Sequence, residues 1–188
     1  MKKRFQLTLL IVYAIFCIII SHGKRITIRS NEMDSFPKLG DIITNNQDDE
    51  ELIVYFVDDV YDMSVLPADT LLINVINKVK FLGNENGTVF NYNYDRNGIF
   101  KVSINSVDRD RGELFTLENI IFEKYKNDRA SDGIQIMFVV ATSDNFQFLV
   151  KNCTFRDNEF KLFRIDVRCS KNYKNTRPFL LFDHCNFM

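Results

Sequence analysis

Hydrophobic residues recur with an unusual spacing in three short segments of the chain. The segments are LFTLENIIF at 114–122, FLVKNCTF at 148–155 and LLFDHCNF at 180–187, and they align at offsets of 33 and 32 residues without a gap. Their apolar positions are two, three and two residues apart. A spacing of two places side chains on one face of a strand. Each segment is therefore expected to form a strand, a sharp corner and a second strand.

Equivalent positions of the three segments are expected to stack in columns. The core ladder would consist of two columns. One contains Phe122, Phe155 and Phe187, and the other contains the smaller residues Ile120, Cys153 and Cys185, each two positions before its Phe. The extra residue falls at the corner, in a column formed by Asn119, Asn152 and His184. Such polar side chains tolerate unusual backbone angles and can bond their own backbone.

Alternating apolar segments also lie between these motifs, and they begin at Phe100, Ile134 and Phe163. The alternation would place Phe100, Val102 and Ile104, then Ile134, Ile136, Phe138 and Val140, then Phe163, Ile165, Val167 and Cys169 inside. Repeated strands at a period of about 30 residues indicate a solenoid. The connections, such as EKYKNDRASDG, are too polar for a helical repeat. The pattern predicts an all-β parallel β-helix of about three to four coils, open at its C-terminal end.

The N-terminal residues have the pattern of an export signal. Three basic residues at 2–4 precede an apolar run at 5–20, and Ser21-His22-Gly23 offers a cleavage site. The run is shorter than the roughly 20 residues of a spanning helix, so residues 1–23 are interpreted as a secretory signal peptide. The alternative is an uncleaved anchor, which is the one arrangement in which we expect a membrane contact. Either way, the globular part is expected to be secreted or held at the cell surface.

Two further segments complete the expected organisation. Residues 24–50 form a polar lead-in, expected to be irregular and flexible, and residues 51–188 form the β-helix. Residues 51–63 are expected to form the entering strand, whereas DTLLINVIN at 69–77 fits either a strand or a capping helix. The chain ends at Met188 within a core strand. We therefore expect the N-terminal part of a longer solenoid, or a terminal coil that pairs with a partner.

Composition and charge narrow the functional classes. The chain of 188 residues has 18 Phe, no Trp, 46% hydrophobic and 26% charged residues, which is typical of one globular, β-rich domain. Loss of the signal peptide would change the formal charge from −1 to −4. No basic stripe remains to follow phosphates, so no nucleic-acid partner is expected.

The repeats also resemble a known group of proteins. KVKFLGNENGTVFNYN at 78–93, LFTLENIIFEKY at 114–125 and FLVKNCTFRDN at 148–158 resemble coils of secreted right-handed parallel β-helix repeat proteins. These belong to the pectin-lyase-like superfamily and include surface sets of anaerobic fungi and some protists. The resemblance implies a right-handed β-helix and, in the enzymes of the group, acidic and basic residues on the outer face of stacked strands.

Only weak catalytic candidates fit that implication. Arg164, Asp166 and Arg168 alternate on the expected outer face, where cross-strand charge pairing is the ordinary role. Asp58-Asp59 resembles the paired acids of polygalacturonases but precedes the motif coils. His184 lacks a second histidine in the mature chain, and the acidic run at 48–51 lacks a calcium-loop spacing. We therefore expect no cofactor and no metal.

Two modification features remain. Cys153 and Cys185 share one phase of the repeat and are expected to form a stacked thiol pair more readily than a disulfide, while Cys169 stays apart. Asn86 and Asn152 each begin an N-glycosylation sequon. Asn86 lies in a turn signal and is the better acceptor, because an inward-facing Asn152 would be held in the corner stack.

Three functions are compatible with these observations. The first is a secreted or cell-surface scaffold or adhesion protein that contacts polysaccharide without catalysis. The alternative is a fragment of a polysaccharide-degrading enzyme similar to pectin or pectate lyases or polygalacturonases. The third is a non-functional truncated copy. The sequence alone names no substrate.

Overall fold

The alternating apolar segments form strands that stack in parallel into three sheets. In the computed structural model, the described residues are 23–47, 51–66, 71–104, 113–126, 135–142, 146–159, 161–168 and 180–188. Several predicted features lie outside the described residues. They are residues 1–22 of the expected signal peptide, most of the acidic run at 48–51, Cys169, and the polar connections at 127–134 and 169–179.

Each complete coil contributes one strand to each of the three sheets. The six-stranded sheet runs β1 (Arg25–Ile28), β2 (Glu51–Phe56), β5 (Lys78–Leu82), β8 (Glu113–Glu118), β11 (Phe146–Lys151) and β14 (Leu180–Asp183). The five-stranded sheet runs β3 (Val60–Asp62), β6 (Thr88–Asn91), β9 (Ile120–Glu123), β12 (Thr154–Arg156) and β15 (Asn186–Phe187). The four-stranded sheet runs β4 (Leu71–Val75), β7 (Phe100–Ile104), β10 (Met137–Ala141) and β13 (Phe163–Val167).

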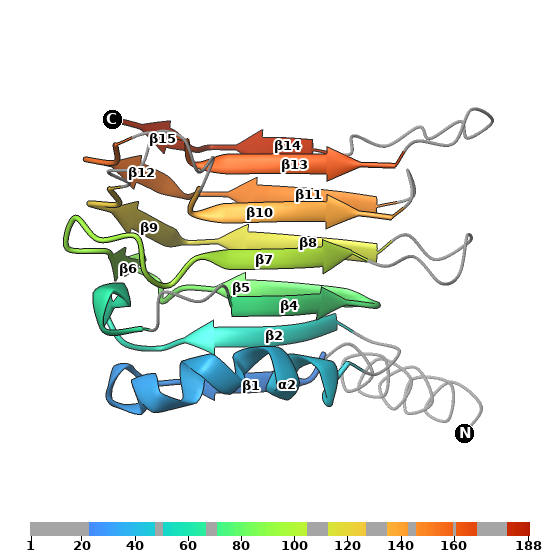
Figure 1. The fold of residues 1–188 in the computed structure, drawn as a ribbon. Coiled ribbons are helices and arrows are strands. Elements are labelled where there is room, and N and C mark those ends of the chain that lie inside the picture. Colours follow the sequence, from blue (N-terminus) through green and yellow to red (C-terminus); the bar gives the residue numbers. More distant parts are fainter. Residues whose placement is uncertain are drawn as a thin grey trace, which may run out of the picture.

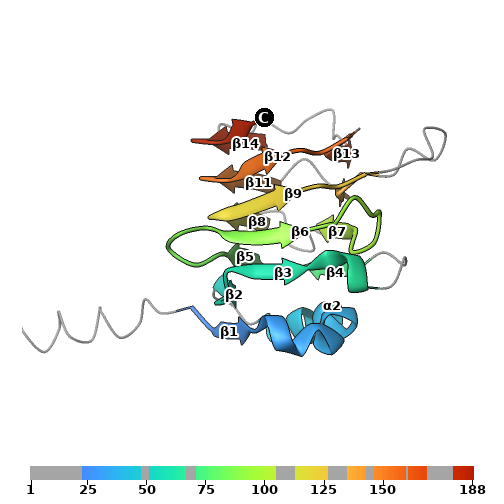
Figure 2. The ribbon, with the colours of Figure 1, turned by 90° about the vertical axis from the view of Figure 1, so that its left-hand side faces the viewer.

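The chain visits the three sheets in a fixed order, so the sheets form the sides of a solenoid of about four turns. It passes from the six-stranded to the five-stranded and then to the four-stranded sheet before it starts the next coil (Figures 1 and 2). This confirms the predicted all-β parallel β-helix.

The core is built from stacked aromatic columns. Phe122 packs face to face on Phe155 at 5.1 Å between ring centroids, and Phe155 packs on Phe187 at 5.0 Å. Phe115 and Phe148 form a second stack at 5.9 Å. The strand register explains this order, because Phe122, Phe155 and Phe187 are direct partners in neighbouring strands. Each such ring pair contributes about 0.5–1.5 kcal/mol beyond the burial of area.

The described part of the polar lead-in, residues 24–47, contains regular elements, whereas an irregular segment was expected. It contains β1, the 3-10 segment η1 (Ser30–Lys38) and the short helix α2 (Leu39–Thr44). Phe36, Leu39 and Ile43 are buried and cover the first coil. These positions have the i, i+3, i+7 spacing of a helical face, so the signal was present but was masked by the surrounding polar residues.

The first coil also differs from the expected division into elements. Residues 51–63 form two strands, β2 and β3, rather than one entering strand. Within the segment that fitted either a strand or a capping helix, Leu71–Val75 is the strand β4, which pairs with β7. The cap of this end of the core is instead formed by η1 and α2 (Figure 2).

Strand β10 lies one residue out of the predicted phase. Met137 pairs with Phe100 and Phe163, so Met137, Val139 and Ala141 point inward. Phe138 and Val140, which the alternation placed inside, are on the outer face. The segment IQIMFVVA is apolar in both phases, so period two alone does not choose between them.

The last described coil leaves apolar side chains at the surface. Leu180, Phe182 and Phe187 are exposed, and Phe187 has 57% of its surface accessible. No helix among the described residues is long and apolar enough to cross a membrane.

Candidate functional site: a polar groove at the sheet corner

The corner between the six-stranded and five-stranded sheets repeats the same left-handed backbone conformation. Asn119, Asn152 and His184 have φ angles of 58°, 53° and 53°. Asparagine adopts this region more readily than most residues because its short polar side chain bonds locally. The backbone N–H of Asn119 donates to the carbonyl oxygen of Lys151 at 3.2 Å, and that of Asn152 donates to Asp183 at 2.9 Å. Backbone bonds between coils thus set the corner.

The corner side chains point outward. Asn152 is exposed, and its Nδ2 donates to Oδ1 of Asn119 at 3.1 Å. The inward orientation considered for Asn152 is therefore wrong, although the residue does belong to a stacked column. The reason is local: the inward position of the corner is already taken by the next residue, Cys153, which is buried. Burial consequently gives no reason to reject Asn152 as a glycan acceptor.

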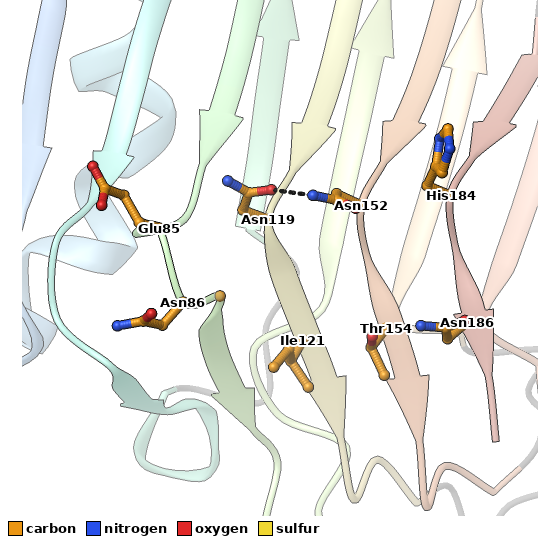
Figure 3. A pocket seen from close by; sticks show the side chains of 9 residues that line it. Glu85, Asn86, Asn119, Ile121, Asn152, Thr154, His184 and Asn186 are labelled. Carbon is orange, nitrogen blue, oxygen red and sulfur yellow. Dashed lines mark hydrogen bonds between the residues drawn. The ribbon is translucent and has the colours of Figure 1, made fainter.

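These outward side chains form one side of a groove of about 180 Å³. Figure 3 shows two rows of side chains that run across the strands, along the solenoid axis. One row is Glu85, Asn119, Asn152 and His184, and the other is Asn86, Ile121, Thr154 and Asn186. The second row follows the strand register, in which Ile121, Thr154 and Asn186 are partners. The groove therefore repeats its side-chain positions once per coil, at about 4.8 Å.

A longer corner loop forms one end of the groove. In this coil four residues are inserted between Gly83 and Thr88, so Glu85 and Asn86 project at the surface. Gly83 is required because a Cβ there would lie 2.0 Å from the carbonyl oxygen of Asn119, and Gly87 has φ of +91°. Asn84 accepts the N–H of Asn86 on its side-chain oxygen. The sequence signal for this loop was the turn pattern GNENG at 83–87.

The loop is anchored by a buried hydroxyl. Thr88 is fully buried, and its Oγ1 lies 2.9 Å from the carbonyl oxygen of Phe56 and 3.1 Å from that of Asp58. The same oxygen accepts the backbone N–H of Asn84 at 3.0 Å. One hydroxyl donates a single hydrogen, so the two carbonyl oxygens share it. The loop that carries Asn86 is therefore attached to the preceding coil.

The groove presents hydrogen-bonding groups of both kinds. An asparagine amide carries two N–H hydrogens and an oxygen with two lone pairs, and a threonine hydroxyl both donates and accepts. Within the described chain, the side chain of Asn152 makes one hydrogen bond, that to Asn119. Its carbonyl oxygen makes no hydrogen bond with the described residues, and the side chain lines the groove. Paired donors and acceptors of this kind match the hydroxyl groups of sugars.

The groove carries little charge. Of its nine lining residues, Glu85 is the one carboxylate, and none is lysine or arginine. The ring nitrogen Nδ1 of His184 lies 2.7 Å from Oδ1 of Asp183, and the imidazole is mostly exposed. His184 is thus an outward corner residue paired with its neighbour in sequence.

The weak catalytic candidates lie elsewhere, on the outer face of the four-stranded sheet. Two nitrogens of Arg164 donate to Asp166, at 2.9 and 3.2 Å, and this pairing raises the pKa of Arg164. Arg168 is exposed and follows the end of β13. The Arg164–Asp166 pair lies within the single strand β13 rather than across neighbouring strands, so it differs from the cross-strand pairing that was expected.

An aromatic residue on the same face was missed by sequence reasoning. The guanidinium of Arg164 lies 4.9 Å from the ring centroid of Phe138, and the ammonium of Lys101 lies 5.9 Å from it. Cations above a ring face are attracted by its quadrupole. Phe138 was assigned to the core because of the phase error in β10, so this cationic and aromatic row had no sequence signal.

The paired acids Asp58 and Asp59 have structural partners. Asp58 accepts the backbone N–H of Ser30 at 2.6 Å and its hydroxyl at 3.0 Å, and the backbone bond is the main reason that the pKa of Asp58 is lowered. Asp59 accepts the side-chain N–H of Asn84 at 2.8 Å. One carboxylate thus holds the N-terminal cap and the other holds the groove loop.

The two cysteines of the core ladder are free thiols. Cys153 is fully buried and Cys185 is partly buried. Burial raises the pKa of Cys153 to about 12, so its thiolate is scarce at neutral pH. The described residues contain no group of three His, Cys, Asp or Glu side chains arranged to hold a metal ion.

Comparison with known proteins gives no relative for this chain. No family model matches the sequence. Neither the curated proteins nor the solved structures contain a match. The geometry of the described coils is consequently the basis for any functional assignment.

Proposed function

We propose that the chain is a scaffold or adhesion protein, secreted or held at the cell surface, that contacts polysaccharide through the corner groove without catalysis. The observation that carries this proposal is the pair of polar rows on either side of the groove. Asn119, Asn152 and Thr154 present amides and a hydroxyl at neighbouring coils. Rigid elements hold them, and a site on stacked strands is more precise than one on loops.

The repeat of the groove supports a chain-like ligand. A polysaccharide repeats its hydroxyl groups along its length. The groove presents side chains at equivalent positions of successive coils along the solenoid axis (Figure 3). Extracellular export is supported by the basic and apolar pattern at residues 2–20. The resemblance of the repeats to the pectin-lyase-like superfamily points to the same class of ligand.

A second candidate is a fragment of a polysaccharide-degrading enzyme similar to pectin or pectate lyases or polygalacturonases. It is favoured by the outer row of Lys101, Arg164, Asp166 and Arg168 beside Phe138. Bases for such chemistry work best when their pKa lies near the operating pH. An arginine guanidinium is protonated at physiological pH, and Asp166 raises the pKa of Arg164 further, so the binding role is the better supported one.

Two assays on the full chain separate these functions. A scaffold is expected to be retained on insoluble plant and fungal cell-wall polysaccharides and to release no unsaturated or reducing ends from soluble polygalacturonate with calcium. Retention on none of the polysaccharides would refute the proposed contact function. Unsaturated or reducing products that disappear in an Arg164→Ala variant would instead establish the enzyme.

A further inference from the structure

We propose that the corner groove is specific for neutral pyranose sugars rather than for acidic sugars, and that the sugars lie along the solenoid axis, across successive coils. This inference rests on the proposed function and adds the class of ligand and its direction.

The lining of the groove has no positively charged lysine or arginine to attract an acidic sugar. Its nine residues include the carboxylate of Glu85. A uronate chain carries one negative charge per sugar, and like charges at close range repel it. A neutral sugar meets no such cost and finds amide and hydroxyl partners.

The groove runs along the solenoid axis. Both rows of groove residues run across the strands rather than along them (Figure 3). Asn119, Asn152 and His184 occupy the same backbone position in three successive coils, and Ile121, Thr154 and Asn186 are direct strand partners. Coils repeat at about 4.8 Å, which is close to the length of one pyranose ring. One sugar per coil is therefore the natural register.

Two sources of neutral sugar are possible, and both meet at this groove. Asn86-Gly87-Thr88 and Asn152-Cys153-Thr154 are N-glycosylation sequons, and Asn86 and Asn152 both line the groove. The first sugar of an N-linked glycan is neutral and bears an amide. The groove thus has the same chemistry for a glycan attached to the chain itself and for an external neutral polysaccharide.

The binding test uses the full-length chain produced in a host that does not attach N-glycans, so that the side chains of Asn86 and Asn152 are both unmodified in the groove. We expect calorimetric titration to detect a neutral β-1,4-linked glucose or N-acetylglucosamine oligomer and to show weaker binding of oligogalacturonate. In the chain made without N-glycans, Asn152→Gly removes the groove amide while its backbone stays at φ 53°. Since one or two hydrogen bonds are lost, affinity should fall by about fivefold to tenfold.

The matched control is Asp157→Gly. Asp157 has φ of 54° and is exposed, but it lies at the other end of β12, outside the groove lining. Equal loss of affinity in Asn152→Gly and Asp157→Gly would overturn the assignment of the groove. Equal or tighter binding of oligogalacturonate would overturn the neutral specificity while leaving the polysaccharide contact standing. Binding of no glycan at all would overturn both.

The source of the sugar is read from the glycosylated wild-type chain. If the affinity of the chain from a glycosylating host for the neutral oligomer is lower than that of the chain made without N-glycans, and rises after enzymatic removal of the glycan, the attached glycan occupies the groove. If the two chains bind equally, the groove is open to external polysaccharide. Both results support the neutral-sugar site and separate its two sources.

Discussion

The register of β10 makes opposite predictions for two adjacent residues. Met137 is fully buried in the core, whereas Phe138 lies on the outer face of the four-stranded sheet. We expect Met137→Ala to lower the free energy of unfolding by about 2–5 kcal/mol, because it leaves a cavity among packed side chains. Simple alternation from Ile134 and Ile136 would predict the reverse order.

The cost of Phe138→Ala is worked from its two cation contacts. Arg164 at 4.9 Å and Lys101 at 5.9 Å from the ring centroid contribute about 0.5–1 kcal/mol each at exposed sites. We therefore expect the loss of both contacts to cost about 1–2 kcal/mol in total. Met137→Ala should therefore be the more destabilising change.

The assay is urea unfolding of the full chain followed by far-ultraviolet circular dichroism. The chain contains no tryptophan, so intrinsic fluorescence is a weaker probe. The two variants are compared by their urea midpoints, provided that the free energy of unfolding falls with urea at the same slope in both. A change of this slope would report a different unfolded or native state. A larger loss of stability in Phe138→Ala than in Met137→Ala would refute the register.

Three further outcomes follow from the described contacts. With a small maleimide at neutral pH, Cys185 should be modified first and Cys153 only on unfolding, because burial raises the pKa of Cys153 to about 12; equal rates would contradict its burial. Asp58→Asn should destabilise the chain near pH 7, because the carboxylate that binds Ser30 has a lowered pKa. A lowered pKa stabilises the fold above the unfolded value near 3.8, so the difference from wild type should shrink as the pH falls below that value; a constant difference would count against the contact. Glycopeptide mapping should find a glycan on Asn86, which is exposed, and its absence from that site in a glycosylating host would contradict the sequon assignment.

Much of the solenoid could be predicted from sequence because its repeat is carried by strongly apolar residues. Phe122, Phe155 and Phe187 recur at nearly constant offsets, and they become neighbours in one sheet. A parallel coil converts an equal sequence offset into direct stacking, so alignment of the chain with itself gave the strand register. The corner position of Asn119 and Asn152 followed from the single spacing of three.

The parts that were missed lack such a repeat. The cap formed by Phe36, Leu39 and Ile43 occurs once, and its apolar face is short. The phase of β10 was ambiguous because Met137 and Phe138 are both apolar, and only the neighbouring strands choose between them. The groove depends on which way a left-handed corner residue points, and spacing alone does not give that direction.

The central claim is that the corner groove holds a neutral sugar chain. Its most direct test is a nuclear magnetic resonance titration of the chain made without N-glycans with a neutral β-1,4-linked glucose oligomer, followed on the side-chain amide signals. We predict that the amides of Asn119, Asn152 and Asn186 shift together and saturate at one affinity. Shifts confined to the side chains of Arg164 and Arg168, on the outer face of the four-stranded sheet, would contradict the claim.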